Sequence, residues 1–166
     1  MKKLCSCFYF LFIIVNVIHA QDDYFEIPDS LQQKTIGELS RLSRANRNKN
    51  IDNAIIYTRA FLQHAKEANN ETAVQYAYMY AALNTKIKGD DDASIRYAKL
   101  CLTYFQKDSR FLGQEFQTLT LLGVISEERG NDKEATEYFL AADAIAEQLN
   151  NPGLLATSTR NLGKMK

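Results

Sequence analysis

Residues 119–142 read LTLLGVISEERGNDKEATEYFLAA, and this stretch decides the fold. Apolar residues recur in it at three- and four-residue intervals, stop at Gly130, and then resume at the same spacing. Each half also carries a small residue inside its apolar stripe, Gly123 in the first and Ala135 in the second. The stretch therefore predicts two amphipathic helices that are joined by a short turn and pack closely.

The same pattern returns about every forty residues along the chain. The first set of small residues is Ser43, Ala82, Gly123 and Gly163, and the second set is Ala54, Ala93 and Ala135. Residues suited to ending a helix follow the first set at a constant interval, at Asn50, Gly89 and Gly130. A repeat of this length predicts an all-α solenoid of three helix pairs followed by a capping or unpaired helix.

The small residues have a physical role in this interpretation. Their short side chains let the partner helix approach closely, and Tyr97 and Phe139 are expected to fill the space between successive units. A larger side chain at Gly123 should therefore overpack the contact. Elsewhere, Asp29 and Gln32 are expected to form a capping box that opens the first helix. Asn151 before Pro152 predicts the start of the last helix.

Residues 1–20 have the layout of a secretory signal peptide. Lys2 and Lys3 supply the positive start, residues 8–18 form an apolar run, and Ala20 precedes the expected cleavage point. The apolar stretch is shorter than the roughly 20 residues of a membrane-spanning helix. We expect an exported periplasmic or secreted protein with a removed signal peptide (1–20), an N-terminal extension (21–28) and one helical domain (29–166).

Composition narrows the classes of function. Without Lys2 and Lys3 the chain keeps 18 of its 20 Lys and Arg residues against 20 Asp and Glu residues. This balance predicts neither a nucleic-acid interface nor, after signal removal, a membrane-binding patch. Cys101 is the one cysteine outside the predicted signal peptide, and its apolar neighbours Leu100 and Leu102 indicate a core position.

The spacing of Leu122, Gly123, Gly130, Ala135, Phe139 and Ala142 resembles the tetratricopeptide repeat (TPR), in the subgroup with a period of about forty residues. The second unit keeps Ala82, Gly89, Ala93 and Tyr97 but is one residue short between its turn and its alanine. The first unit is the most divergent. The layout also resembles the extracytoplasmic TPR region of bacterial sensor and regulator proteins.

The resemblance implies a groove that binds a protein or peptide and is lined by the first helix of each pair. Carried over position by position, its lining is Arg44, Arg47, Tyr76, Met79, Leu83, Lys86, Gln117, Thr120, Val124 and Glu127. This surface would have an apolar centre, a basic end and an acidic end. The helical spacing of Tyr76, Met79 and Leu83 fits core positions equally well, so both interpretations stay open.

Catalytic and metal sites find little support in the sequence. His64 is the one histidine outside the predicted signal peptide, and it lies among polar residues as a solvated side chain would. The run of Asp90, Asp91 and Asp92 is interpreted as a helix cap, because the residues after it lack the regular oxygen ligands of a calcium loop. Glu127 and Glu128 are interpreted as a solvated acidic rim. We therefore expect no enzyme, no cofactor and no metal.

The last unit repeats the small-residue signature at Gly163, close to the final residue, Lys166. One interpretation is a capping helix that covers the apolar end of the stack. The alternative is that the chain is the sensor-input part of a transmembrane histidine kinase or helix-turn-helix regulator. An uncovered end could also pair with a second copy of the chain through the C-terminal helix.

Overall fold

The computed structural model describes residues 26–165, and the predicted signal peptide lies outside this range. The described residues form helices and turns, with no strand among them. Their elements are α1 (Asp29–Gln32), α2 (Ile36–Asn46), α3 (Ile51–Glu67), α4 (Glu71–Lys88), α5 (Asp91–Phe105), the 3-10 turn η1 (Ser109–Phe111), α6 (Leu112–Glu128), α7 (Asp132–Gln148) and α8 (Pro152–Lys164). The predicted all-α class is confirmed.

Short polar residues begin most of these helices. The side-chain oxygens of Asn50, Asn70 and Asp90 accept hydrogen bonds from backbone N–H groups three residues further on, at 3.0, 3.0 and 2.9 Å. Asn151 does the same for Gly153 and Leu154 at the start of α8. Each bond satisfies one of the free N–H groups of a first helical turn. The predicted cap at Asp90 and the predicted helix start at Asn151 are confirmed.

The helices also end where left-handed residues break them. Gly89 and Gly130 have φ angles of 89° and 73°, in a region that favours glycine. Asn69 and Asn150 take the same role with φ angles of 51° and 47°. In the asparagine pairs at residues 69–70 and 150–151, the first asparagine therefore ends one helix and the second caps the start of the next.

The start of the chain differs from the prediction. Asp29 and Gln32 belong to the single turn α1, whose N-cap is Pro28 and has no side-chain cap. The capping box lies at Thr35 instead, where Glu38 N–H donates to Thr35 Oγ1 at 3.2 Å and Thr35 N–H donates to Glu38 Oε2 at 2.8 Å. The Thr35 backbone N–H and hydroxyl hold the pKa of Glu38 below its usual value. The predicted box at Asp29 is therefore wrong, and the observed box lies six residues later, after α1.

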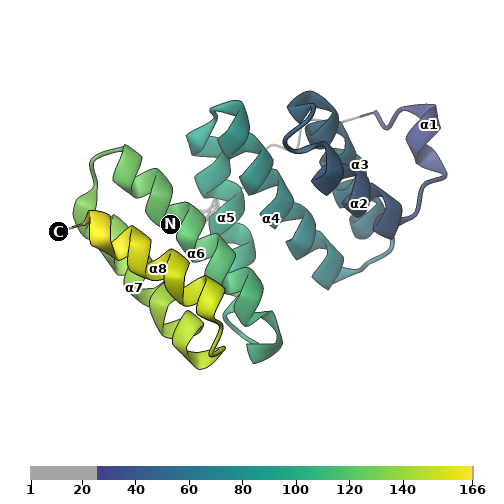
Figure 1. Cartoon of the computed structure of the whole chain (residues 1–166). Coiled ribbons are helices and arrows are strands. Elements are labelled where there is room, and N and C mark those ends of the chain that lie inside the picture. Colours follow the sequence, from purple (N-terminus) through teal and green to yellow (C-terminus); the bar gives the residue numbers. More distant parts are fainter. Residues whose placement is uncertain (1–25, 166) are drawn as a thin grey trace, which may run out of the picture.

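The helices form antiparallel hairpins that follow one another in a row, from α1 and α2 at one end to α8 at the other (Figure 1). Each long helix packs against the helices before and after it in the chain. In addition, α2 touches α4, and α4 touches α6. The first helices of successive hairpins therefore lie side by side.

The predicted close approach at Gly123 is present. A Cβ atom on Gly123 would lie 2.5 Å from Cε1 and 2.7 Å from Cδ1 of Phe139, and the Phe139 ring is fully buried. The ring thus occupies the volume that any other side chain at residue 123 would need. Ser43, Ala82, Ala54 and Ala135 are buried as well.

The second hairpin corrects the predicted packing of Tyr97. Ser94, Ala98 and Cys101 are fully buried on α5, as is Phe105 at its end, and the first three share the spacing of Ala135, Phe139 and Ala142 in α7. Tyr97 is half-buried on the flank, where its ring stacks on Tyr78 at a centroid distance of 6.0 Å. Ala93 is buried, but the closest approach belongs to the next residue, since Ser94 Oγ donates to Ala82 O at 2.8 Å.

Gly163 is a second correction. It is exposed on α8, and a Cβ atom there would meet nothing within 4 Å. The predicted packing role of Gly163 is wrong, because no described helix follows α8 to press against it.

At the other end, Ile27 lies in the predicted extension yet is only 8% exposed and joins the first core cluster.

Candidate partner-binding surface

The predicted lining residues are distributed over three neighbouring helices. Arg44 lies on α2 and Arg47 is its C-cap residue; Tyr76, Met79, Leu83 and Lys86 lie on α4; and Gln117, Thr120, Val124 and Glu127 lie on α6. Because α4 touches both α2 and α6, these residues belong to adjoining elements. We call the accessible part of this set, together with Ile87, the inner-helix surface.

The apolar centre of this surface is smaller than predicted. Met79 is only 5% exposed and belongs to the first core cluster, and Tyr76 packs edge-on against Phe105 and Phe111. Core packing therefore accounts for both residues. The accessible apolar side chains are Leu83 and Val124, which are half-buried, and Ile87, which is 50% exposed.

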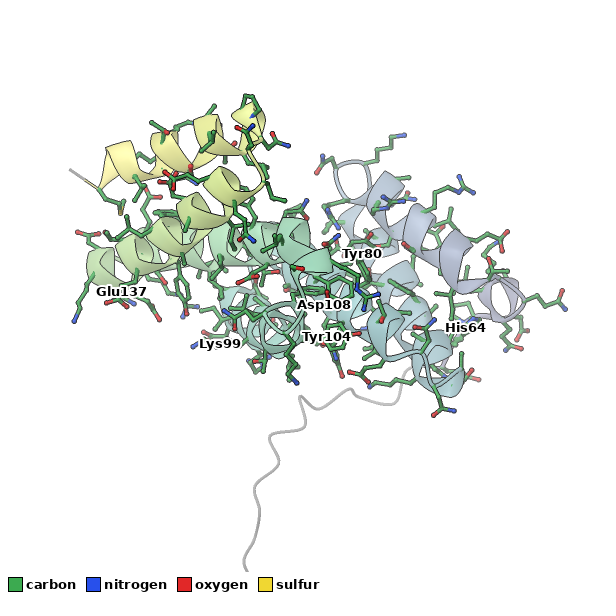
Figure 2. All side chains as sticks on the ribbon, turned by 90° about the horizontal axis from the view of Figure 1, so that it is seen from below. His64, Tyr80, Lys99, Tyr104, Asp108 and Glu137 are labelled. Atoms are coloured by element: carbon green, nitrogen blue, oxygen red, sulfur yellow. The ribbon has the colours of Figure 1, made fainter. Side chains whose placement is uncertain are left out.

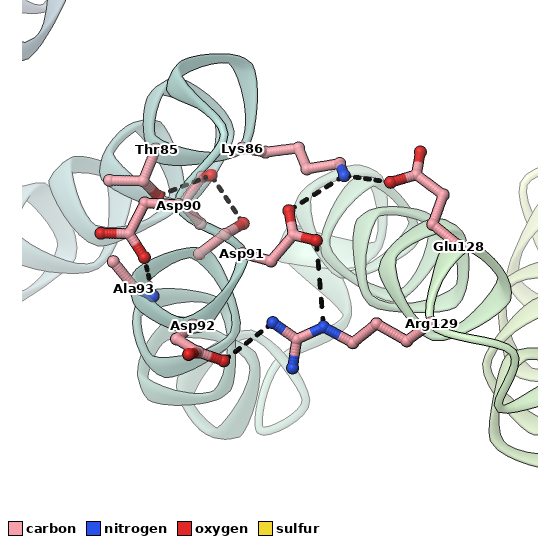
Figure 3. Close-up of polar contacts among 10 residues, drawn as sticks. Thr85, Lys86, Asp90, Asp91, Asp92, Ala93, Glu128 and Arg129 are labelled. Atoms are coloured by element: carbon pink, nitrogen blue, oxygen red, sulfur yellow. Dashed lines mark hydrogen bonds and ion pairs between the residues drawn. The ribbon is translucent and has the colours of Figure 1, made fainter.

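The charged residues of the surface are paired across neighbouring helices (Figure 3). Lys86 Nζ lies 3.0 Å from Asp91 Oδ1 and also contacts Glu128. Burial alone would lower the pKa of Lys86, but hydrogen bonds to Glu128 and Asp91 outweigh it and raise that pKa. Glu127 lies 3.7 Å from Lys164 of α8.

These pairs partly neutralise the acidic end of the predicted surface. Glu127 and Glu128 do form an acidic edge, but each has a lysine within ion-pair distance. Arg44 is exposed and forms no ion pair with any residue in the described part of the chain. Arg44 on α2 is therefore the accessible cation of this surface that is not paired with an acidic side chain among the described residues.

A buried polar network connects α2 to the next hairpin. Asn84 Nδ2 donates to Thr58 Oγ1 at 2.9 Å and to Ser43 Oγ at 3.2 Å, and the two hydroxyl oxygens are 2.6 Å apart. Arg47 Nε donates to Asn84 Oδ1 at 2.9 Å, and its guanidinium lies over the Tyr80 ring at 5.4 Å. Burial lowers the pKa of Arg47. Arg47 is thus a structural bridge as much as a surface residue.

Ion pairs also recur on the outer side of the hairpins, which the sequence interpretation missed. Lys88 at the end of α4 contacts Asp52 in the first turn of α3 at 2.5 Å. One unit later, Arg129 after α6 contacts Asp92 in the first turn of α5 at 2.8 Å. The signal was present as an acidic residue and a basic residue that each recur after about forty positions.

A second accessible feature lies between α5, α6 and α7. It is a cleft of about 410 Å³ with Ile95 and Leu122 among its apolar residues. Its polar lining is Asp92, Arg96, Lys99, Ser126, Arg129, Asn131, Glu134 and Tyr138. None of these residues was singled out as a binding residue from the sequence.

The structure offers few reactive groups in the described range. Cys101 is fully buried, as predicted, and this burial raises the pKa of its thiol to about 12. Residues 26–165 hold no cluster of three or more His, Cys, Asp and Glu side chains placed to bind a metal ion. Over the same residues, no helix combines the length and apolar character that a membrane crossing requires.

Comparison with known proteins assigns neither a family nor a function to this surface. The sequence matches no family model, and no curated protein matches it.

Proposed function

We propose that this chain is an exported, TPR-like α-solenoid that binds a protein or peptide segment along the inner-helix surface and catalyses no reaction. Three observations support the solenoid. The two helices of a hairpin pack through small residues, the first helices of successive hairpins lie side by side, and polar contacts link neighbouring units at similar sequence intervals. Export rests on residues 1–20, which lie outside the described range.

The observation that carries the binding proposal is that Leu83 and Ile87 on α4 and Val124 on the neighbouring α6 are accessible apolar side chains. The half-exposed Ile87 and Leu83, one helical turn before it, provide an apolar contact that excludes water when a partner covers it. Arg44 on one flank and the acidic edge at Glu128 on the other supply polar contacts around the patch. A polypeptide with apolar anchors and charged flanks suits this arrangement.

A displayed random-peptide library tests the proposal. Peptides selected on the native protein should lose most of their binding to the Ile87→Ser/Val124→Ser variant, because their apolar anchors lose contact area. Leu140→Ser is the matched control, since Leu140 is 54% exposed on α7, away from the inner-helix surface. Circular dichroism melts should confirm that all variants are folded. Selected peptides that bind the double variant as tightly as the native protein would refute this location.

A further inference from the structure

The cleft between α5, α6 and α7 has a different chemistry from the inner-helix surface. Its α5 wall carries Arg96 and Lys99, which are one helical turn apart. Its α7 wall carries Glu134 and Tyr138, which are four residues apart. A cationic wall therefore faces a wall that carries a carboxylate and a phenol.

The cations of the cleft are not equivalent. Arg129 is engaged, because its guanidinium contacts Asp92 at 2.8 Å and Asp91 at 3.8 Å. Arg96 and Lys99 are exposed and form no ion pair with any side chain of residues 26–165. Figure 2 shows Lys99 on the flank of the molecule that also carries Glu137 of α7. The α5 wall thus has two positive charges available to an anion.

Glu134 on the opposite wall can accept a hydrogen bond from a ligand. Ser126 Oγ donates to Glu134 Oε2 at 2.8 Å, which holds the carboxylate in place and leaves further acceptor positions on its oxygens. Burial, the nearby Glu134 carboxylate and a hydrogen bond to that carboxylate raise the pKa of Tyr138, so its hydroxyl stays protonated at neutral pH and takes one of the acceptor positions of Glu134. Glu134 is therefore an acceptor, and it opposes the entry of a strongly charged anion.

The preceding hairpin junction shows how such a space can be closed. Tyr97 lies one repeat before Tyr138, and its ring stacks on Tyr78 with an interplanar angle of 22°. Lys66 lies over the same Tyr78 ring at 5.9 Å. Tyr138 has no such stacking partner among the described rings, and it lines an accessible cleft.

We propose that this cleft binds a carboxylate that adjoins a peptide amide. The carboxylate would lie between Arg96 and Lys99, and the amide N–H would donate a hydrogen bond to Glu134. With Arg129 and Asp92 of the lining paired to each other, two cations and one carboxylate remain, and their net single positive charge favours a carboxylate over a phosphate dianion. The buried Leu122 and the partly buried Ile95 can contact a short aliphatic side chain. The site is independent of the inner-helix surface.

Nuclear magnetic resonance titration of the ¹⁵N-labelled protein tests this proposal. N-acetyl-L-alanine carries the carboxylate and the amide of a chain end, and N-acetyl-L-aspartic acid α-amide carries those of an acidic side chain. At least one of them should shift the amide resonances of residues 92–99 and 129–138 saturably, with a Kd on the order of 1 mM. The tighter of the two identifies the natural source of the carboxylate.

Substitutions assign the two halves of the ligand. Arg96→Gln/Lys99→Gln should weaken binding about tenfold or more, because charged hydrogen bonds are lost. Lys107→Gln, which removes an exposed positive charge outside the cleft, is the matched control and should leave binding unchanged. Glu134→Ala should weaken the binding of N-acetyl-L-alanine but not that of acetate, because acetate has no amide.

Four results would overturn the proposal. They are the absence of saturable shifts with either peptide analogue, equal binding by the Arg96→Gln/Lys99→Gln variant, equal binding of the neutral N-acetyl-L-alanine amide, and tighter binding of inorganic phosphate. The Ile87→Ser/Val124→Ser variant should bind these analogues normally, so failure here is separable from failure of the inner-helix surface.

Discussion

The first and third hairpins make the same helix–helix contact with different chemistry. In the first, the small residue Ser43 meets Thr58 through hydroxyl groups 2.6 Å apart, and Asn84 of the next hairpin donates to both. In the third, Gly123 has no side chain and the fully buried Phe139 ring fills the space. The contact can therefore be made by hydrogen bonds or by apolar packing, provided that the residue on the first helix is small.

The largest expected difference between the two contacts concerns their second-helix residues. Phe139→Ala should lower the free energy of unfolding by about 3–5 kcal/mol, because it leaves a cavity at a fully buried site. Thr58→Ala should cost about 1–3 kcal/mol, because Asn84 and Ser43 each lose a partner. Urea unfolding followed by circular dichroism measures both. Equal costs would show that the two contacts are energetically alike.

A glycine-to-alanine pair tests whether the close approach is confined to the third hairpin. Gly123→Ala should destabilise by about 1–3 kcal/mol, because the new methyl group meets a ring with no free space around it. Gly163→Ala, on an exposed helix surface, should instead stabilise by up to about 1 kcal/mol. Thermal melts at one protein concentration give the comparison, and the same sign for both variants would contradict it.

The second hairpin has a thiol, Cys101, among its fully buried residues. The titration of this thiol reports whether water reaches it in the folded state. Unfolding exposes Cys101, whose pKa then falls from about 12 to its ordinary value near 8.5. Stability from this group is therefore complete below about pH 8.5 and declines as the pH rises toward 12.

Between about pH 8.5 and pH 9.5 the decline should be about 1 kcal/mol in the wild type relative to Cys101→Ala. Urea unfolding at the two pH values measures it. Parallel pH dependence of the two proteins would mean that water reaches the thiol in the folded state.

The smallest expected effect belongs to the outer ion pairs that recur between hairpins. Lys88→Gln and Arg129→Gln should each lower the melting temperature slightly at low ionic strength, since both pairs are solvent-exposed. The differences should vanish in about 1 M salt, where charges are screened within about 3 Å. A difference that survives high salt would indicate packing by the side-chain stems.

The helices and their ends were largely predictable because the signals are local. Asn, Asp and Gly mark the boundaries of a helix through bonds that span a few residues. The orientation of α5 was not, because a shift of one residue rotates the buried face by about 100°. Counting five residues from the helix-ending glycine would have found it, since Gly89 leads to Ser94 as Gly130 leads to Ala135.

The inner-helix surface was predicted by position but not in its chemistry. Nine of the ten residues lie on three adjoining helices, and Arg47 caps the end of the first. However, the resemblance could not show that Met79 is buried, or that Lys86 and Glu127 each face an oppositely charged residue from another helix. Such pairings depend on how adjacent hairpins are set against each other, and residues far apart in sequence supply them.

The hydrogen-bonded contact of Ser43, Thr58 and Asn84 limits the modularity of the chain. Its donors and acceptors match in one arrangement only, whereas a ring against a glycine imposes shape without polarity. A duplicated third hairpin could follow its own parent, but the same hairpin inserted after α3 would bring no amide to the two hydroxyl groups. Units of this chain are thus alike in outline and not interchangeable.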